Sequence, residues 1–183
     1  SYPATTAGTV SNGVLAAGGI TVNGYGIGPS IGDGVSAAGS NDSAIAKAAA
    51  FNAVSGSTGV TAKATATTLT GAAPTIATPA AIEGDATNNI YVNNVKLGYI
   101  AAGATAVTQG ANIAAAFNAV SNQSGVTATF STTTGAVSLT AADGRNISLI
   151  GKGTGADATN TGLTVGAGGN IAAAAAPTTF TAL

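Results

Sequence analysis

The chain has 183 residues, of which only 6% are charged, with five Lys or Arg and six Asp or Glu. An ordinary soluble domain carries roughly 25% charged residues, so this composition is typical of a structural protein. The basic residues stand singly, and without a basic patch the chain has nothing to neutralise the phosphates of a nucleic acid. Cysteine and histidine are absent, which excludes a disulfide framework and most transition-metal sites.

The apolar residues are scattered along the chain, although the mean hydropathy is +0.40. Their longest run, residues 171–176, is far shorter than the roughly 18 residues that a membrane-spanning helix requires. The sequence therefore predicts no membrane span. Because it starts at Ser1 and contains no methionine, we expect it to be a piece cut from a longer polypeptide.

Two segments of the chain occur twice. Residues 48–65 reappear as residues 114–131, and residues 20–28 reappear as residues 90–98. Self-similarity at a fixed spacing is the mark of a repeated structural unit, so each predicted element of the first copy is taken together with its counterpart in the second.

Each copy is predicted to open with a β-hairpin. In residues 20–27, two short apolar segments flank Asn23 and Gly24, and both residue types accept the positive φ of a type I′ turn. The second copy carries Asn93 and Asn94 at the same place. This pair predicts a weaker form of the same turn.

A helix is predicted after each hairpin, over residues 43–55 and 109–121. The first follows four residues that favour a helix start: Ser40, Asn41, Asp42 and Ser43. In the second, Ile113, Phe117 and Val120 fall on one stripe of the 3.6-residue period. We expect Gly56 and Asn122 to close the two helices in a left-handed conformation.

Strict alternation of apolar and polar residues then predicts half-buried strands over residues 60–65 and 126–131. The second copy continues through a turn at Thr134 and Gly135 to a strand containing Val137 and Leu139. A further turn at Asp143 and Gly144 leads to a strand over residues 147–150. This pattern predicts an antiparallel meander.

The rest of the chain is less regular. Residues 69–87 contain Pro74 and Pro79 and predict an edge strand or a connection. The tail, residues 162–183, predicts a short strand over residues 163–165, followed by an alanine run and a final apolar segment. We expect the first and the last dozen residues of the chain to pair with each other.

These elements predict an α+β fold. It consists of two tandem modules, each with a β-hairpin, one α-helix and an antiparallel β-meander. The expected boundaries are residues 1–75 for the first module and residues 76–165 for the second, with a C-terminal return segment over residues 166–183.

The repeated block resembles the flagellin hook IN motif. In both copies, a helix ending in Phe-Asn-Ala-Val-Ser is followed by a Gly-Val-Thr-Ala strand. The resemblance extends over residues 20–27, 44–62, 90–97, 114–128 and 139–147, somewhat more than a third of the chain. Two departures stand out. Both copies have Phe-Asn, at Phe51-Asn52 and Phe117-Asn118, where the motif is named for Ile-Asn, and the first copy lacks the Leu-Thr-Ala-Ala-Asp-Gly turn of the second.

The resemblance implies a structural, surface-exposed outer domain of a flagellin, the extracellular subunit of the bacterial flagellar filament that serves motility. The partners that it implies are neighbouring flagellin subunits and O-linked glycans on exposed Ser and Thr, with no nucleic acid and no membrane. The terminal helices that build the filament core in this family are not found in the chain, so polymerisation is not expected of these residues. The alternative is an extracellular adhesin or glycan-binding repeat module of another surface appendage. A groove lined by Tyr2, Tyr25, Tyr91 or Tyr99 would favour that alternative.

Several short motifs are compared with known catalytic patterns, and none predicts an enzyme. Residues 28–32 match the G-x-S-x-G pattern around Ser30, but a serine nucleophile needs a base, and the chain has no histidine. A surface turn is expected there instead. Residues 151–154 resemble part of a phosphate-binding loop around Lys152, but the first glycine of that motif is missing. We expect no catalytic, cofactor-binding or metal-binding residues and no cofactor.

Acidic residues are also too few for a cation site. Glu83 and Asp85 lie two residues apart, but two carboxylates fall short of the six to eight oxygens that Ca²⁺ takes. A solvated loop is expected there, and a turn with its charges in water is expected at Asp143 and Arg145. N-x-[ST] patterns for N-glycosylation begin at Asn41, Asn122 and Asn146.

Asn52 and Asn118 are the polar residues of greatest interest. Each follows a phenylalanine at the edge of its helix's apolar stripe, where an unpaired amide would cost about 1–3 kcal/mol. We expect each side-chain amide to bond to the backbone of a neighbouring strand and so lock the helix to the sheet.

Overall fold

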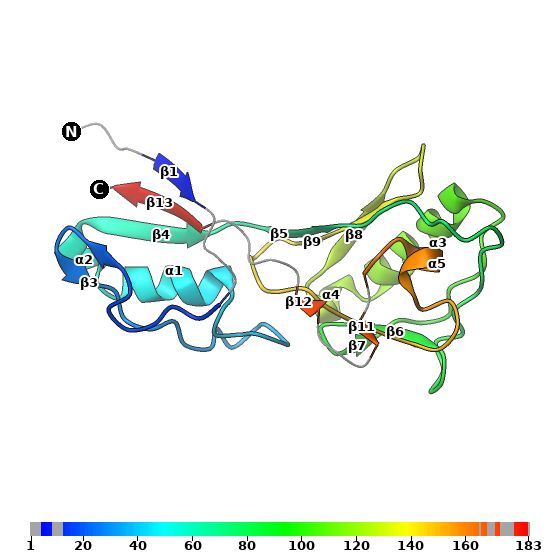
Figure 1. Cartoon of the computed structure of the whole chain (residues 1–183), viewed down its shortest axis with the longest axis horizontal. Coiled ribbons are helices and arrows are strands. Elements are labelled where there is room, and N and C mark those ends of the chain that lie inside the picture. The colour runs from blue at the N-terminus through cyan, green and yellow to red at the C-terminus, as the bar shows by residue number, and fades with distance from the viewer. Residues whose placement is uncertain (1–4, 9–12, 165, 168–170, 173–177, 183) are drawn as a thin grey trace. The chain divides into compact units, whose positions relative to one another are not determined.

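The computed structural model describes residues 5–8, 13–164, 166–167, 171–172 and 178–182. Helices and largely antiparallel sheets make an α+β fold, as the sequence predicts (Figure 1). The chain divides into two compact units: Ser1–Thr67 with Ala142–Asn146 and Ala174–Leu183, and Thr68–Ala141 with Ile147–Ala173. The module boundaries expected after residues 75 and 165 stay a prediction, because sequence repeats and compact units in space need not coincide.

In the first unit, the predicted hairpin is formed by β2 (Thr21–Val22) and β3 (Tyr25–Gly26). Asn23 has a φ of 49° and Gly24 a φ of 85°, so both turn residues adopt the left-handed backbone of a type I′ turn. The predicted hairpin and its turn are therefore confirmed.

The predicted helix is α1 (Ala44–Asn52), and the Ser43 hydroxyl caps it by accepting from the Ala46 N–H at 3.0 Å. The prediction that Gly56 closes the helix was wrong. After a break at Val54, the chain makes a further helical turn, α2 (Ser55–Thr58), and Gly59 ends that turn with a φ of 67°. The break arises because Val54 adopts a φ of −117° and a ψ of 14°, which are not helical angles.

A three-stranded antiparallel sheet completes the first unit. It has the order β1 (Thr5–Gly8), β13 (Thr178–Ala182), β4 (Val60–Ala64). β1 pairs with β13 from Thr5 opposite Thr181 to Gly8 opposite Thr178, so the predicted pairing of the first and last dozen residues is confirmed. The first unit has a small apolar core, which consists of Ile27, Ala48, Ala50, Phe51 and Ala62.

In the second unit, the hairpin is formed by β6 (Asn89–Val92) and β7 (Val95–Lys96). Asn93 and Asn94 both have positive φ, 48° and 66°, as the turn requires. Helix α3 (Ala106–Ala119) begins three residues before the predicted start, because Thr105 and Thr108 form a reciprocal capping box.

Asn122 does not end the second helix, so this prediction was also wrong. It lies within a short helical turn, α4 (Ser121–Ser124), which Gly125 closes with a φ of 72°. The reason is the same as in the first unit. Val120 leaves helical geometry and the chain then makes one more turn before the strand.

The second unit also has a three-stranded sheet, in the order β5 (Thr67–Thr70), β9 (Val137–Ala141), β8 (Thr127–Phe130). β8 and β9 form the predicted antiparallel pair, and β5, from the stretch expected to be an edge or a connection, is an edge strand. Helix α3 and this sheet enclose a core that includes Ile113, Phe117, Val126 and Leu139.

The third strand expected for the meander is found in another sheet. β10 (Ser148–Lys152) pairs with β6 rather than with β9. That sheet also holds β7, β11 (Gly166–Ala167) and β12 (Ile171–Ala172). The turn at Gly144, with a φ of 87°, is present, but the chain after it pairs along the outer edge of the hairpin.

Between β10 and β11 the chain forms one short helix, α5 (Ala158–Thr161), capped by Asp157. Leu163 and Thr164 are not in a strand, so the predicted strand over residues 163–165 is not formed by them, and Val165 lies outside the described residues. Leu163 instead fills the core, and the Thr161 hydroxyl accepts from its backbone N–H at 3.1 Å. Most of the alanine run also lies outside the described residues.

The two three-stranded sheets are built in the same way. Ala62 of β4 lies opposite Phe180 of β13, and the equivalent Ala128 of β8 lies opposite Leu139 of β9. β13 therefore occupies in the first unit the position that β9 occupies in the second. The first unit takes its middle strand from the end of the chain, after the whole second unit.

No helix in the described part of the chain is long and apolar enough to cross a membrane.

Removal of residues 178–183 should unfold the first unit selectively. The truncation deletes the strand that joins β1 to β4, whereas β5, β8 and β9 keep all their partners. In hydrogen exchange read by mass spectrometry, we expect peptides of α1 and β4 to lose protection and peptides of α3 and β8 to keep it. Equal loss in both sets, or in neither, would contradict the role given to β13.

Candidate functional site

The side chain of Asn118 connects α3 to β8 through two hydrogen bonds. Its Nδ2 donates to the Ala128 carbonyl at 2.9 Å, and its Oδ1 accepts from the Ala128 N–H at 2.8 Å. Asn52 does the same between α1 and β4, with distances of 2.9 and 2.8 Å to the carbonyl and N–H of Ala62. The predicted helix-to-strand bonds are confirmed in both copies, and we call each pair an asparagine clamp.

The position of the clamp explains why it needs an asparagine. Among the strands that the structure describes, β4 and β8 lie at sheet edges, so the N–H and C=O groups on their outer side face no neighbouring strand there. Only an amide side chain offers one donor and one acceptor side by side, as a neighbouring strand does. Each clamp therefore covers one residue of an open sheet edge.

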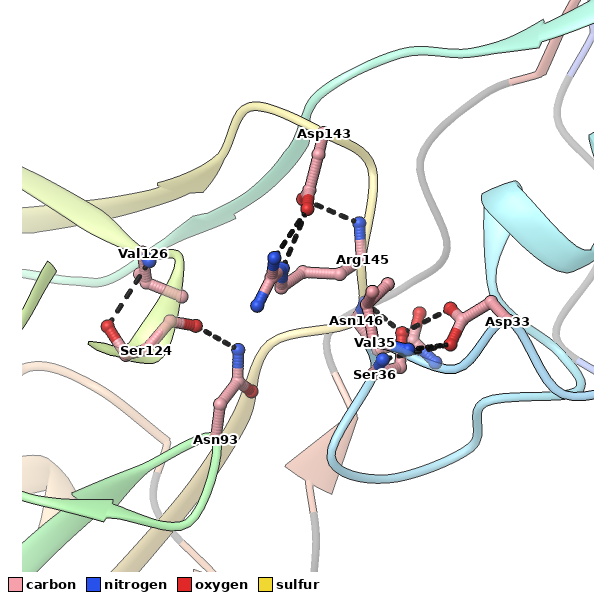
Figure 2. A network of polar contacts seen from close by, with 9 residues as sticks. All are labelled: Asp33, Val35, Ser36, Asn93, Ser124, Val126, Asp143, Arg145 and Asn146. Atoms are coloured by element: carbon pink, nitrogen blue, oxygen red, sulfur yellow. Dashed lines mark hydrogen bonds and ion pairs between the residues drawn. The ribbon is translucent and has the colours of Figure 1, made fainter. Parts of the chain in front are cut away.

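In each unit, a second asparagine bonds the turn of the hairpin to the short helical turn, α2 or α4, that follows the main helix. The sequence pattern predicted only a role in the turn for this asparagine. Asn93 Nδ2 donates to the Ser124 carbonyl at 2.9 Å (Figure 2), and Asn23 Nδ2 donates to the Thr58 carbonyl at 2.7 Å. The hydroxyls of Thr58 and Ser124 in turn accept from the N–H groups of Val60 and Val126, each at 3.2 Å. The sequence did contain a signal for these bonds, because Asn recurs at the hairpin turn, and Ser or Thr recurs before the strand, at equivalent places in the two copies.

Residues 28–32, the G-x-S-x-G match, lie at the surface, where Pro29 and Ile31 are exposed, but the side chain of Ser30 is buried. Its hydroxyl accepts from the Leu15 N–H at 2.9 Å and donates to the Asn41 carbonyl at 2.6 Å. These two bonds join separate loops of the first unit. They occupy both hydrogen-bonding roles of the hydroxyl with backbone groups rather than with a base.

A polar network in the first unit gathers around Asn146, which is 1% exposed. Its backbone N–H donates to the Ser36 hydroxyl at 3.0 Å, and this hydroxyl donates to Asp33 at 2.6 Å (Figure 2). Burial alone would raise the pKa of Asp33, but hydrogen bonds from Ser36, Ser43 and Val35 outweigh it and lower the pKa below its ordinary value. Because the Asn146 side chain is itself buried, it is not accessible as a glycosylation acceptor in the folded chain. Asn41 and Asn122, which begin the other two N-x-[ST] patterns, are exposed.

Of the two carboxylates considered for a cation site, Glu83 is exposed and Asp85 is bonded within its own turn. Asp85 is exposed and accepts from the N–H groups of Thr87 and Asn88, and these bonds lower its pKa. Asp143 pairs with Arg145 at 2.7 Å within the same turn. Burial would raise the pKa of Asp143, but the hydrogen bonds and charge of Arg145 lower it overall. Lys152, from the partial phosphate-loop match, donates to the Ala86 carbonyl at 2.8 Å.

The structure does not bring the named residues together into one reactive cluster. In the described ranges, no group of three or more acidic residues is placed to hold a metal ion. The tyrosines are dispersed as well: Tyr25 and Tyr99 are exposed, Tyr91 is half-buried, and Tyr2 lies outside the described residues. Tyr99 borders a shallow open hollow on α3 with Asn112 and Ala116, whose other lining residues are Ile100, Ala101 and Ala115.

Lys47 is a charged residue at a core position. It is fully buried on α1, where the second copy has Ile113. Burial lowers the pKa of Lys47, and the nearby charge of Asp42 opposes this effect in part. The first unit thus carries an ionisable amine where the second carries an apolar side chain.

No protein-family model matches the chain, and no curated protein matches it significantly.

Replacing Asn118 with Ala should destabilise the second unit by about 1–3 kcal/mol, because it leaves the N–H and C=O of Ala128 without a protein partner. Asn118→Asp should recover only part of this loss, since a carboxylate accepts from the N–H but faces the carbonyl with a second acceptor. Urea unfolding followed by amide signals of the second unit measures the change. Asn122→Ala, at an exposed residue of α4, serves as the control, and an equal effect there would contradict the clamp.

Replacing Lys47 with Ile, the residue of the second copy, should remove the part of the first unit's pH-dependent stability that this buried amine causes. The pKa of Lys47 is lower in the folded than in the unfolded chain. In the pH window between these two pKa values, the unfolded state therefore binds more protons than the folded state. Wild-type stability should therefore rise as the pH climbs through that window. The unfolding free energy of the wild type should rise relative to that of the variant over this pH range. Urea unfolding of both proteins at a series of pH values measures this difference, and a difference that stays constant with pH would contradict the role of the amine.

Proposed function

We propose that the chain is a surface-exposed structural domain of a flagellin, placed on the outside of the flagellar filament and extracellular. The observation that carries the proposal is the equivalent use of the repeated block in both units. The Phe-Asn pair in which the resemblance to the hook IN motif is centred places a buried phenylalanine in each core and an asparagine clamp on each edge strand. The sequence repeat is thus also a repeat of interactions.

The composition of the surface supports the same proposal. Only 6% of the residues are charged, and the acidic side chains at Asp33, Asp85 and Asp143 are bonded within their own turns. Thr, Ser and Asn are the commonest polar residues of the sequence. Such a surface supplies bulk and hydroxyl groups, and the exposed Ser and Thr are the proposed sites of O-linked glycans.

Pairing of the first and last strands is consistent with this role. Because β1 and β13 are neighbours in one sheet, the first and last strands of the first unit lie side by side. A domain connected in this way can be carried on a single stalk by a longer polypeptide. In the proposed parent protein, filament assembly is left to segments other than these, and neighbouring subunits are the partners of the outer domain.

The proposal is tested in the producing cell. Immunogold electron microscopy with antibodies raised against the chain should label flagellar filaments along their length. Deletion of these residues from the parent gene should leave filaments that assemble but are thinner in cryo-electron microscopy. Labelling of another appendage, or of the cell wall alone, would exclude a flagellin and favour the adhesin alternative.

A glycan array tests the glycan-binding alternative separately. Binding to the array that Tyr99→Ala abolishes would favour this alternative, because Tyr99 borders the hollow on α3.

A further inference from the structure

The hairpin of the first unit has an open edge where the hairpin of the second unit is covered. β6 pairs with β7 on one side and with β10 on the other. β2, its equivalent, pairs only with β3 in the described part of the chain. The two hairpins share their sequence pattern and turn geometry, so the covered edge shows what the open one accommodates.

The backbone groups on the open edge of β2 can be identified from its pairing with β3. The Ile27 N–H donates to the Ile20 carbonyl at 2.8 Å, so Ile20 turns its backbone groups toward β3. In an antiparallel strand the next residue turns the opposite way, and Thr21 therefore directs its N–H and C=O outward. No residue in the described ranges bonds to them.

Asn23 adds a second donor and acceptor to this edge. In the second unit, the Asn93 N–H donates to the Ser148 carbonyl, and the Asn93 Oδ1 accepts from the Ser148 N–H, both at 2.9 Å. The bond from Asn23 Nδ2 to Thr58 holds the Asn23 side chain as the bond from Asn93 Nδ2 to Ser124 holds its counterpart. The Asn23 N–H and Oδ1 are thus left at the exposed edge, with no partner among the described residues.

Side-chain exposure distinguishes the two hairpins in the same way. Ile90 is fully buried, whereas the equivalent Ile20 is 36% exposed, and Tyr25 beside it is 50% exposed. Isolated exposed apolar residues are ordinary, but Ile20 adjoins the open edge of β2, and Tyr25 lies across the hairpin on β3.

We propose that β2 pairs with β2 of a second copy of this chain, antiparallel across a two-fold axis. Asn23 of one copy then lies opposite Thr21 of the other, with the two Val22 residues at the axis. Each Thr21 N–H donates to the Asn23 Oδ1 of the other copy, and each Asn23 N–H donates to the Thr21 carbonyl. The pattern is that of Asn93 with Ser148, with Thr21 in the place of Ser148.

A second copy fits this edge because the edge is self-complementary. Each copy offers two donors and two acceptors, so symmetric pairing satisfies all of them and closes as a dimer. The register also places Gly24 opposite Ile20, as Gly151 lies opposite Ile90 in the second unit. With a formal net charge of −1, the chains repel each other weakly. Because the edge is short, we expect the dimer to be weak. The pairing does not depend on the function proposed above.

A dilution series of the uniformly ¹⁵N-labelled chain tests the pairing. As the concentration rises, the backbone amide signals of Thr21 and Asn23 should shift together, since both N–H groups gain acceptors. The amides of Tyr91 and Asn93 are internal controls, because β10 already covers their edge. Signals of Thr21 and Asn23 that stay fixed up to the highest soluble concentration would overturn the proposal.

A single cysteine provides the second test, because the chain has none of its own. The two Val22 residues would form a non-hydrogen-bonded pair with Cα atoms about 4.5 Å apart, within reach of a disulfide. Oxidised Val22→Cys should give several-fold more disulfide-linked dimer than Thr133→Cys, at an exposed turn, while Val92→Cys, buried beside β10, should give almost none. Equal yields from Val22→Cys and Thr133→Cys would count against the pairing.

The same spectra identify a different occupant of the edge. A synthetic peptide with the sequence of residues 148–152 imitates β10. If this peptide shifts Thr21 and Asn23 while dilution does not, the edge accepts another extended strand and the pairing with a second copy is wrong. If Val22→Cys disturbs the fold, as circular dichroism would reveal, the dilution series of the unaltered chain decides.

Discussion

Both units depend on an asparagine amide that bonds to the N–H and C=O of one residue in an edge strand. The helices are rich in alanine, whose small side chain allows close approach but provides little shape to fix how a helix lies on a sheet. Two directional hydrogen bonds supply what the packing lacks. With Asn52 bonded to Ala62 and Asn118 to Ala128, helix and strand have one register, and the phenylalanine before each asparagine points into the core.

The two units share the same arrangement of helix and strands but differ in the size of their apolar cores and in their backbone pairing. The second unit has a core of large apolar side chains, including Ile113, Phe117 and Leu139, and its hairpin edge is covered by β10. The first unit has a smaller core in which alanines predominate, and Lys47 stands where Ile113 stands in the second. Its stability therefore depends more on backbone pairing, above all on β13 between β1 and β4.

Local patterns predicted the local structure well. The turn residues at Asn23 and Asn93, the helix cap at Ser43 and the two clamps follow from the donors and acceptors that each side chain carries. The ends of the helices were mispredicted because glycines at Gly59 and Gly125, beyond one more helical turn, compete with the earlier candidates. The partner of β10 could not be predicted, because alternation identifies the buried face of a strand but not its neighbour. The hydroxyls of Thr58 and Ser124 were missed since serine and threonine occur throughout the chain.

The nested arrangement of β13 has a consequence for the order of folding. Asn52 and Ala62 are ten residues apart, so a clamp can close as soon as its helix and strand leave the ribosome. β4 and β13, in contrast, are separated by the whole second unit, and their pairing pays the entropy of closing a long loop. Prior folding of the second unit shortens that loop. The first unit is thus begun early in synthesis and completed only after the second unit, when β13 arrives.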